Sequence, residues 1–134
     1  MQNGWRARQF GDVVDRFRVE CRRASHGLWD DVLAAYGFLR ARGPNCGNAI
    51  AKKLVNAKGI WELIGRDGNL QARLLFYFDT SDPALIVFVY GFIKSGGAKD
   101  YRKAIETSQS RRSLLQRGER TLNVIASFDS LTRH

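Results

Sequence analysis

Apolar residues recur at two different spacings along the chain, and the change of spacing separates helical from strand-like parts. An apolar stripe from Val13 to Cys21 repeats at helical spacing and predicts a helix over 12–23. A second stripe predicts a helix over 28–42, which Gly43-Pro44 would stop. Both segments carry aspartates in the first turn and arginines in the last, the arrangement that the helix dipole favours.

From Gly59 onward the apolar period becomes two, which is typical of strands. Three strands are predicted over 60–66, 70–79 and 85–93. The dipeptide Asp67-Gly68 is a hairpin signal, and a second turn is expected over 80–83. Because both connections are short, the three strands should form an antiparallel meander.

The remaining segments complete the predicted fold. A short strand over 5–10 precedes the helices, and a helix from 98 to about 116 follows the meander. The segment 45–55 is compatible with a short helix or an ordered loop. The order predicts an α+β fold, in which an N-terminal strand, two helices and a closing C-terminal helix accompany a small, mainly antiparallel sheet. We expect the helices to cover one face of that sheet.

The length of 134 residues predicts a single domain over 1–134. Its core should span about 5–112, and 113–134 would be a C-terminal extension. Leu122, Val124, Ile125 and Phe128 make this extension too apolar for a simple disordered tail. It is expected either to pack on the domain or to meet a partner.

The net charge is +9 and the isoelectric point about 10.2. Such an excess favours a polyanionic partner, of which nucleic acid is the commonest. The alternative is a basic protein whose charge serves only solubility.

Two cysteines, Cys21 and Cys46, lie far apart without a CxxC motif. His26 and His134 do not complete a convincing zinc set with them, so two reduced thiols, no metal and no cofactor are expected. The first residues do not resemble a signal peptide, and the longest apolar run, over 84–93, is about half a membrane span. A cytoplasmic protein without membrane contact is therefore expected.

Three stretches in this order resemble the RelE/ParE superfamily of bacterial toxins, most closely its phage-derived, HigB-like branch. They read LRARGPNCGNAIAKKL, KGIWELIGRDGNLQARLLFYF and LIVFVYGFIKSGGAKDYRKAIETSQSR. They are similar to a helix end with Gly-Pro, a Leu-Tyr-Glu-Leu-Arg strand with a following Tyr-Arg-Val strand, and a Gly-Phe-x-Lys strand end with a basic helix. The resemblance covers roughly residues 5–112.

The resemblance implies the toxin of a type II toxin–antitoxin module. It implies a ribosome-dependent mRNA endoribonuclease that works without a metal and inhibits translation. Its partners would be mRNA on the ribosome and a cognate antitoxin of the HigA-like, helix-turn-helix class. Two alternatives stay open: a ParE-like inhibitor of DNA gyrase on the same fold, and a non-catalytic basic RNA- or DNA-binding module.

Three residues are the candidate catalytic set. Arg73 occupies the family's Tyr-Arg position, and its guanidinium could hold a phosphate; alternatively it pairs with Glu62 or Asp79. Lys94 matches the family's strand-end lysine and could contact phosphate or act as a general acid, or be merely solvated. Tyr101 could act as a base if the surrounding lysines lower its pKa, stack on a nucleotide base, or simply pack on the sheet.

The remaining cations are candidates for RNA binding. Arg66 stands two residues after Ile64, which replaces the family's arginine. The other three candidates follow the last strand: Lys99, Arg102 and Lys103. Arg111 and Arg112 could extend this basic strip along the helix, or form part of a solvated face. Neither histidine lies near the meander, so the candidate set consists of cations and one tyrosine.

Overall fold

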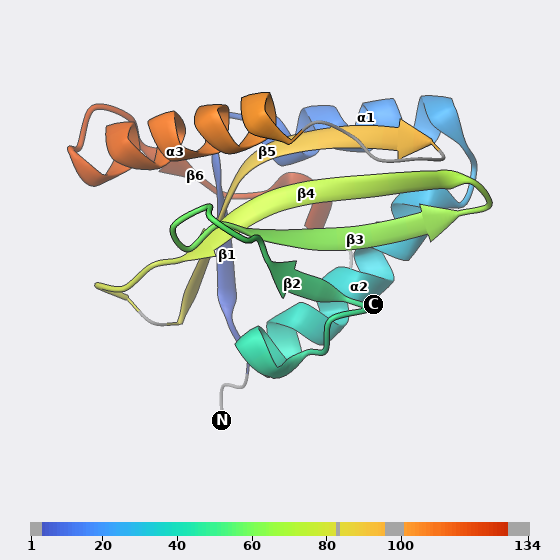
Figure 1. Cartoon of the computed structure of the whole chain (residues 1–134), viewed down its shortest axis with the longest axis horizontal. Coiled ribbons are helices and arrows are strands. Elements are labelled where there is room, and N and C mark those ends of the chain that lie inside the picture. Colours follow the sequence, from blue (N-terminus) through green and yellow to red (C-terminus); the bar gives the residue numbers. More distant parts are fainter. Residues whose placement is uncertain (1–3, 83, 96–100, 129–134) are drawn as a thin grey trace.

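Six strands form one sheet in the order β2-β3-β4-β5-β1-β6, flanked by helices (Figure 1). The computed structural model describes residues 4–82, 84–95 and 101–128. The elements are β1 (Arg6–Phe10), α1 (Val13–Ala24), α2 (Leu28–Arg42), the 3-10 turn η1 (Gly43–Asn45), β2 (Ala51–Lys53), β3 (Trp61–Asp67), β4 (Leu70–Phe78), β5 (Leu85–Ser95), α3 (Arg102–Gln116) and β6 (Leu122–Asn123). The α+β class is confirmed.

The predicted meander is present. β3 and β4 pair antiparallel with Asp67 opposite Leu70, as a two-residue turn requires, and β4 pairs antiparallel with β5. The helix over 28–42 has the predicted bounds, and the helix predicted over 12–23 is shifted by one residue. The start predicted for the last helix, 98–100, lies outside the described residues.

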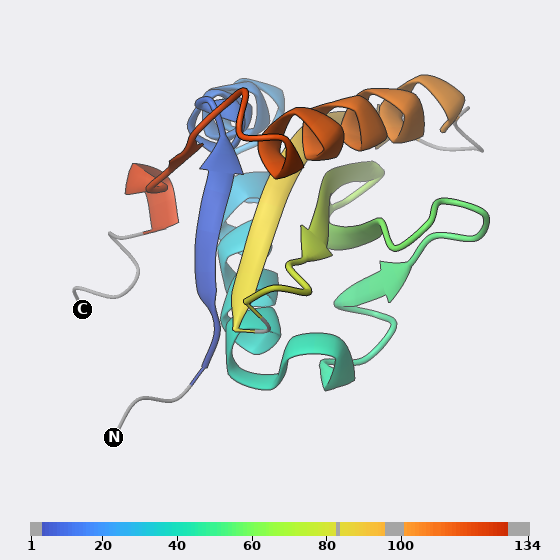
Figure 2. The ribbon, with the colours of Figure 1, turned by 90° about the vertical axis from the view of Figure 1, so that its left-hand side faces the viewer.

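Two strands have positions that the periodicity did not show. β1 lies inside the sheet, beside β5 and parallel to it, as Figure 2 shows. The segment 45–55, expected to be a helix or a loop, contains the short edge strand β2, which pairs with β3. That prediction was wrong because three residues are too few to display a period.

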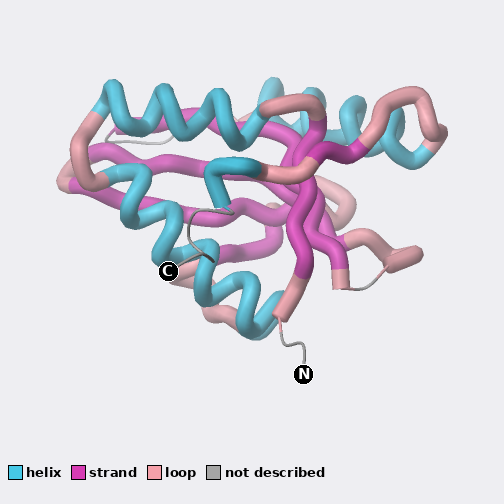
Figure 3. The backbone as a smooth tube through the Cα atoms, turned by 180° about the vertical axis from the view of Figure 1, so that it is seen from behind, coloured by secondary structure: helices cyan, strands magenta, loops and turns pink. Residues whose placement is uncertain are grey.

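The helices cover both faces of the sheet, which corrects the expectation of one covered face. α1 and α2 bury Phe17, Trp29 and Leu39 against one side of the strands, and Figure 3 shows both helices in front of the sheet. α3 packs Ala104 on the opposite side, against residues such as Leu75 and Val87. β4 contributes side chains to two hydrophobic cores, because residues of a strand alternate between its faces. Its even-numbered residues face α1 and α2 in a first core, and its odd-numbered residues face α3 in a second core.

The C-terminal segment is part of the first core. Phe128 is 2 % exposed and stacks on Tyr36 with ring centroids 3.9 Å apart, and Ile125 is also buried. Polar contacts fix its position, because Gln9 Nε2 donates to the carbonyl of Val124 and the Ser127 N–H donates to Asp15. Of the two roles left open for this segment, packing on the domain is therefore observed.

Candidate functional site

Arg73 lies in the middle of β4 on the face that carries α3. Across the sheet it stands between Ile64 of β3 and Phe92 of β5. Its side chain is only 8 % exposed, so the guanidinium requires a partner. Nη1 lies 2.9 Å from Oε2 of Glu62, which is 1 % exposed. Of the two partners proposed from the sequence, Glu62 is therefore the one used.

Tyr101 closes this ion pair into a network. It precedes α3, and its hydroxyl donates to Oε1 of Glu62 over 2.8 Å while accepting from Nη1 of Arg73 over 3.0 Å. Nη2 of Arg73 donates to the side-chain carbonyl of Gln71. We call these four side chains, Glu62, Gln71, Arg73 and Tyr101, the Arg73 cluster.

The ring of Tyr101 is fixed as firmly as its hydroxyl. It meets Phe92 edge to face, with centroids 5.2 Å apart and an interplanar angle of 81°. Phe92 stands opposite Arg73 on the neighbouring strand. Strand register and the start of α3 therefore bring together residues 28 positions apart in the chain.

The electrostatics of Tyr101 correct one expectation. Burial raises the pKa of Tyr101 well above its usual value, and its hydrogen bond to the Glu62 carboxylate raises it further. Arg73 opposes this shift without reversing it. The expectation that neighbouring cations lower this pKa was wrong, because a buried carboxylate contacts the phenol directly. Tyr101 thus carries its proton at neutral pH.

Lys94 and Arg66 stand at the rim of the Arg73 cluster. Gln71 pairs with Arg66 on one side and with Lys94 on the other, so the three residues form one row across β3, β4 and β5. Lys94 is half-buried at the end of β5. Nζ of Lys52 on β2 lies 3.9 Å from Oε2 of Glu62. Arg73 and Lys52 therefore contact the buried Glu62 carboxylate, at 2.9 and 3.9 Å, whereas Arg66 and Lys94 flank Gln71 farther along the strands.

Arg66 is exposed and held in place by two contacts. Its backbone N–H donates to Asp31 of α2 over 2.6 Å, and Nη1 donates to the carbonyl of Ala49 over 3.1 Å. Arg102 and Lys103 are exposed in the first turn of α3, which adds the positive end of a helix dipole. Lys99 lies outside the described residues.

Two further arginines have roles that the sequence did not indicate. Arg111 donates to the carbonyl of Val89 over 2.6 Å, and Arg112 lies over the ring of Tyr77 at 4.6 Å. They pack α3 onto the sheet rather than extend an open basic strip. Sequence reasoning also missed Gln71 and Lys52. The signal for the centre of the cluster is a single glutamate, Glu62, in one apolar strand and a single arginine, Arg73, in the next strand.

The model of the phage-derived Gp49-like protein family (DUF891) matches residues 20–113. The chain belongs to this family. Gp49-like proteins are associated with RelE-type, toxin-like proteins. The matched region contains every member of the Arg73 cluster and excludes β1 and β6. Searches of curated proteins and of solved structures found no match.

Within 4–82, 84–95 and 101–128 of this Gp49-like chain, no group of three His, Cys, Asp or Glu residues is placed to hold a metal ion. Cys21 and Cys46 are both buried free thiols, and burial raises the pKa of Cys21 to about 12. In the same ranges, no helix is long and apolar enough to cross a membrane.

Proposed function

We propose that this protein is the toxin of a type II toxin–antitoxin module and, like HigB, cleaves mRNA on the ribosome. The observation that carries the proposal is the Arg73 cluster, which joins Arg73 to Tyr101 beside Lys94. It lies within the region that matches a toxin-like family. Arg73 and Tyr101 are in contact, and Lys94 stands on the neighbouring strand opposite Gln71, another member of the cluster, which supports the proposal.

The proposed reaction is a transesterification within RNA. The 2′-oxygen attacks the adjacent phosphorus, the bond from phosphorus to the 5′-oxygen breaks, and a 2′,3′-cyclic phosphate and a 5′-hydroxyl form. Negative charge on the phosphorane requires a fixed cation, and Arg73 can supply a planar, bidentate one. Nε of Arg73 is buried without a hydrogen-bond partner among the described residues, so this guanidinium retains donor capacity.

Protonated Tyr101 suits a relay better than a phenolate base. In the proposed step its oxygen takes the proton of the 2′-hydroxyl while its own proton passes to Oε1 of Glu62, 2.8 Å away. Lys94 would then protonate the leaving 5′-oxygen. Each transferred proton thus has a named donor and acceptor, and no cofactor enters the reaction.

The contacts that already occupy the Arg73 guanidinium support the proposed dependence on the ribosome. Arg73 is bonded to Glu62 and Gln71, so a phosphate must compete with these contacts. A message held in position by the ribosome would meet that cost through orientation. An antitoxin of the HigA-like class is the expected partner that silences the protein, and the cytoplasm is its expected compartment.

The test is an in vitro translation reaction with a defined message, in which RNA 5′ ends are mapped. Tyr101→Phe removes one hydroxyl and keeps the ring, and Tyr77→Phe is its matched control on the same sheet face. Arg73→Ala is compared with Arg112→Ala, whose guanidinium lies over Tyr77. We expect cuts on translated but not naked message, at least 100-fold slower with Tyr101→Phe or Arg73→Ala and unchanged in both controls.

One observation favours a second candidate function. The guanidinium of Arg73 is already neutralised by Glu62, as in a purely structural ion pair. A gyrase inhibitor on this fold would need no catalytic cluster. Intact message with folded protein, together with loss of DNA supercoiling by gyrase, would replace the nuclease proposal with this one.

A further inference from the structure

One edge of β5 changes its surroundings half-way along the strand. β1 pairs with β5 only from Leu85 to Phe88 and then turns into α1. β5 continues to Ser95, still paired with β4 on its other side. Among the described residues, no strand covers the β1 side of β5 from Tyr90 to Ile93.

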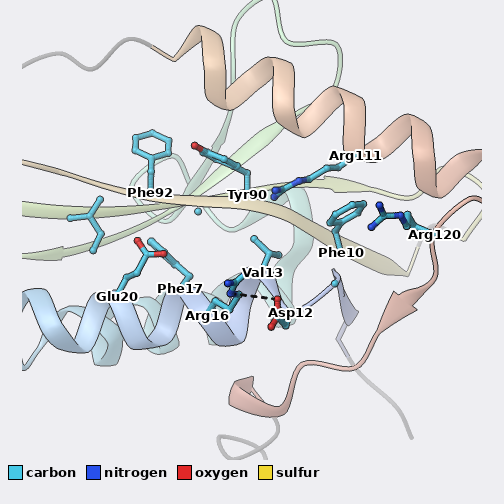
Figure 4. A pocket seen from close by; sticks show the side chains of 13 residues that line it. Phe10, Asp12, Val13, Arg16, Phe17, Glu20, Tyr90, Phe92, Arg111 and Arg120 are labelled. Atoms are coloured by element: carbon cyan, nitrogen blue, oxygen red, sulfur yellow. Dashed lines mark ion pairs between the residues drawn. The ribbon is translucent and has the colours of Figure 1, made fainter.

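This uncovered edge forms the floor of a groove between α1 and α3. Figure 4 shows β5 running between the two helices, with side chains from both turned toward it. The groove has a volume of about 750 Å³. Its lining includes Phe10, Arg16, Glu20, Tyr90, Ile93 and Arg120. Peptide groups of a strand alternate between its edges, so every second residue here directs its N–H and C=O away from β4.

One carbonyl at the start of the groove already has a substitute partner. Arg111 Nη1 donates to the carbonyl of Val89 over 2.6 Å, where β1 ceases to pair with β5. A side chain therefore fills the hydrogen-bonding position that a neighbouring strand would otherwise occupy. Strand edges without such a partner readily pair with another chain. Beyond Val89, the β1 side of β5 presents the peptide groups of Gly91 and Ile93, for which the described residues supply no hydrogen-bond partner.

Three arginines, Arg16, Arg111 and Arg120, outnumber the two acidic lining residues, Asp12 and Glu20, so the charge of the groove favours an acidic occupant. Two guanidinium groups, those of Arg111 and Arg120, lie over the same Phe10 ring at 5.0 and 5.6 Å. Arg16 of α1 lies across the groove, weakly paired with Asp12 at 3.9 Å. Burial lowers the pKa of Arg111, a cost that an incoming carboxylate would offset.

We infer that this groove is a docking site for an extended, acidic peptide segment of a partner protein, which adds a strand to the open edge of β5. Backbone pairing would supply the affinity, and alternate side chains would meet the aromatic residues and the arginines. A second copy of this chain is a poor occupant, because each copy carries a net charge of +9. RNA is a poor occupant because the alternating N–H and C=O groups of a strand edge pair with another peptide backbone, which RNA lacks. The inference does not depend on nuclease activity.

The test uses labelled ten-residue peptides that alternate glutamate with valine or phenylalanine. One control carries N-methyl groups at alternate residues, which block backbone pairing, and another replaces glutamate with lysine. Binding is followed by fluorescence anisotropy, and contact by amide chemical shifts of the isotope-labelled full chain. We expect the acidic peptide to bind and to shift the amides from Tyr90 to Ile93, and neither control peptide to bind.

Charge reversal separates this groove from general electrostatic attraction. The double variant Arg16→Glu/Arg120→Glu changes two exposed lining residues and should weaken binding at least tenfold. Arg18→Glu, exposed on the same helix but outside the groove, should leave binding within twofold. Failure of the acidic peptides to bind, equal effects of both variants, unmoved β5 amides, or stronger shifts of those amides by single-stranded RNA would each overturn the inference.

Discussion

The energetics of the candidate site depend on a single buried ion pair. Arg73 and Glu62 are 8 % and 1 % exposed, and each leaves the other uncompensated if it is removed. Breaking such a pair is much costlier than replacing both members together. At the residue scale, the cluster is therefore a structural feature as well as a chemical one.

Glu62→Ala should destabilise the fold by about 3–5 kcal/mol, because the Arg73 guanidinium then lacks a buried partner. The double variant Glu62→Leu/Arg73→Met should recover most of this loss. Lys52→Ala, which removes the half-exposed lysine near Glu62, should cost less than about 0.5 kcal/mol. Urea unfolding measures all three, and additive losses in the double variant would contradict the interpretation.

The raised pKa of Tyr101 predicts a loss of stability at high pH. The unfolded tyrosine ionises near its ordinary value of about 10, while the folded one keeps its proton, so unfolding releases a proton above that pH. Between pH 9 and 11, the wild-type protein should lose about 1 kcal/mol more stability than Tyr101→Phe. If the unfolding free energies of the two proteins changed in parallel with pH, this prediction would be wrong.

At the scale of elements, two glycines set how closely the helices approach the sheet. A Cβ at Gly65 of β3 would lie 2.6 Å from Val32 of α2, and one at Gly91 of β5 would lie 2.7 Å from Phe17 of α1. Both helices therefore pack where a strand lacks a side chain. This contact positions α1 beside the groove at the β5 edge.

Gly65→Ala and Gly91→Ala should each destabilise by about 1–3 kcal/mol, because the added methyl group pushes a helix from the sheet. Gly37→Ala is the matched control, since a Cβ there meets nothing within 4 Å and the residue lies inside α2. It should stabilise by about 0.5–1 kcal/mol. Thermal unfolding gives the comparison, and a stabilising Gly65→Ala would contradict the packing described here.

At the scale of the whole molecule, the net charge of +9 predicts salt-sensitive binding to RNA. Lys94→Ala and Lys103→Ala should each lower the slope of log affinity against log salt by about 0.7 for a single-stranded oligonucleotide. Arg22→Ala, exposed on α1, should leave the slope unchanged. Equal slopes for all three variants and the wild type would show that no localised RNA-binding surface exists.

Much of the fold could be predicted from local pattern, and the site only in part. Helix α2 and the meander follow from apolar spacing and turn residues, which are local properties. β2 and the position of β1 could not be predicted, because pairing depends on distant segments. Arg73 and Tyr101 were identified through resemblance, whereas Gln71 and Lys52 join them only through strand register.

By itself the sequence determined the class of fold, the identity of most elements and the basic surface, because spacing and charge are properties of the chain. Tertiary structure decided which face each helix covers, that Phe128 completes the core and that Glu62 neutralises Arg73. It also decided that the Tyr101 hydroxyl donates a hydrogen bond to Glu62 and that β1 leaves half of one β5 edge uncovered. These outcomes depend on register and burial, which arise only when distant residues pack together.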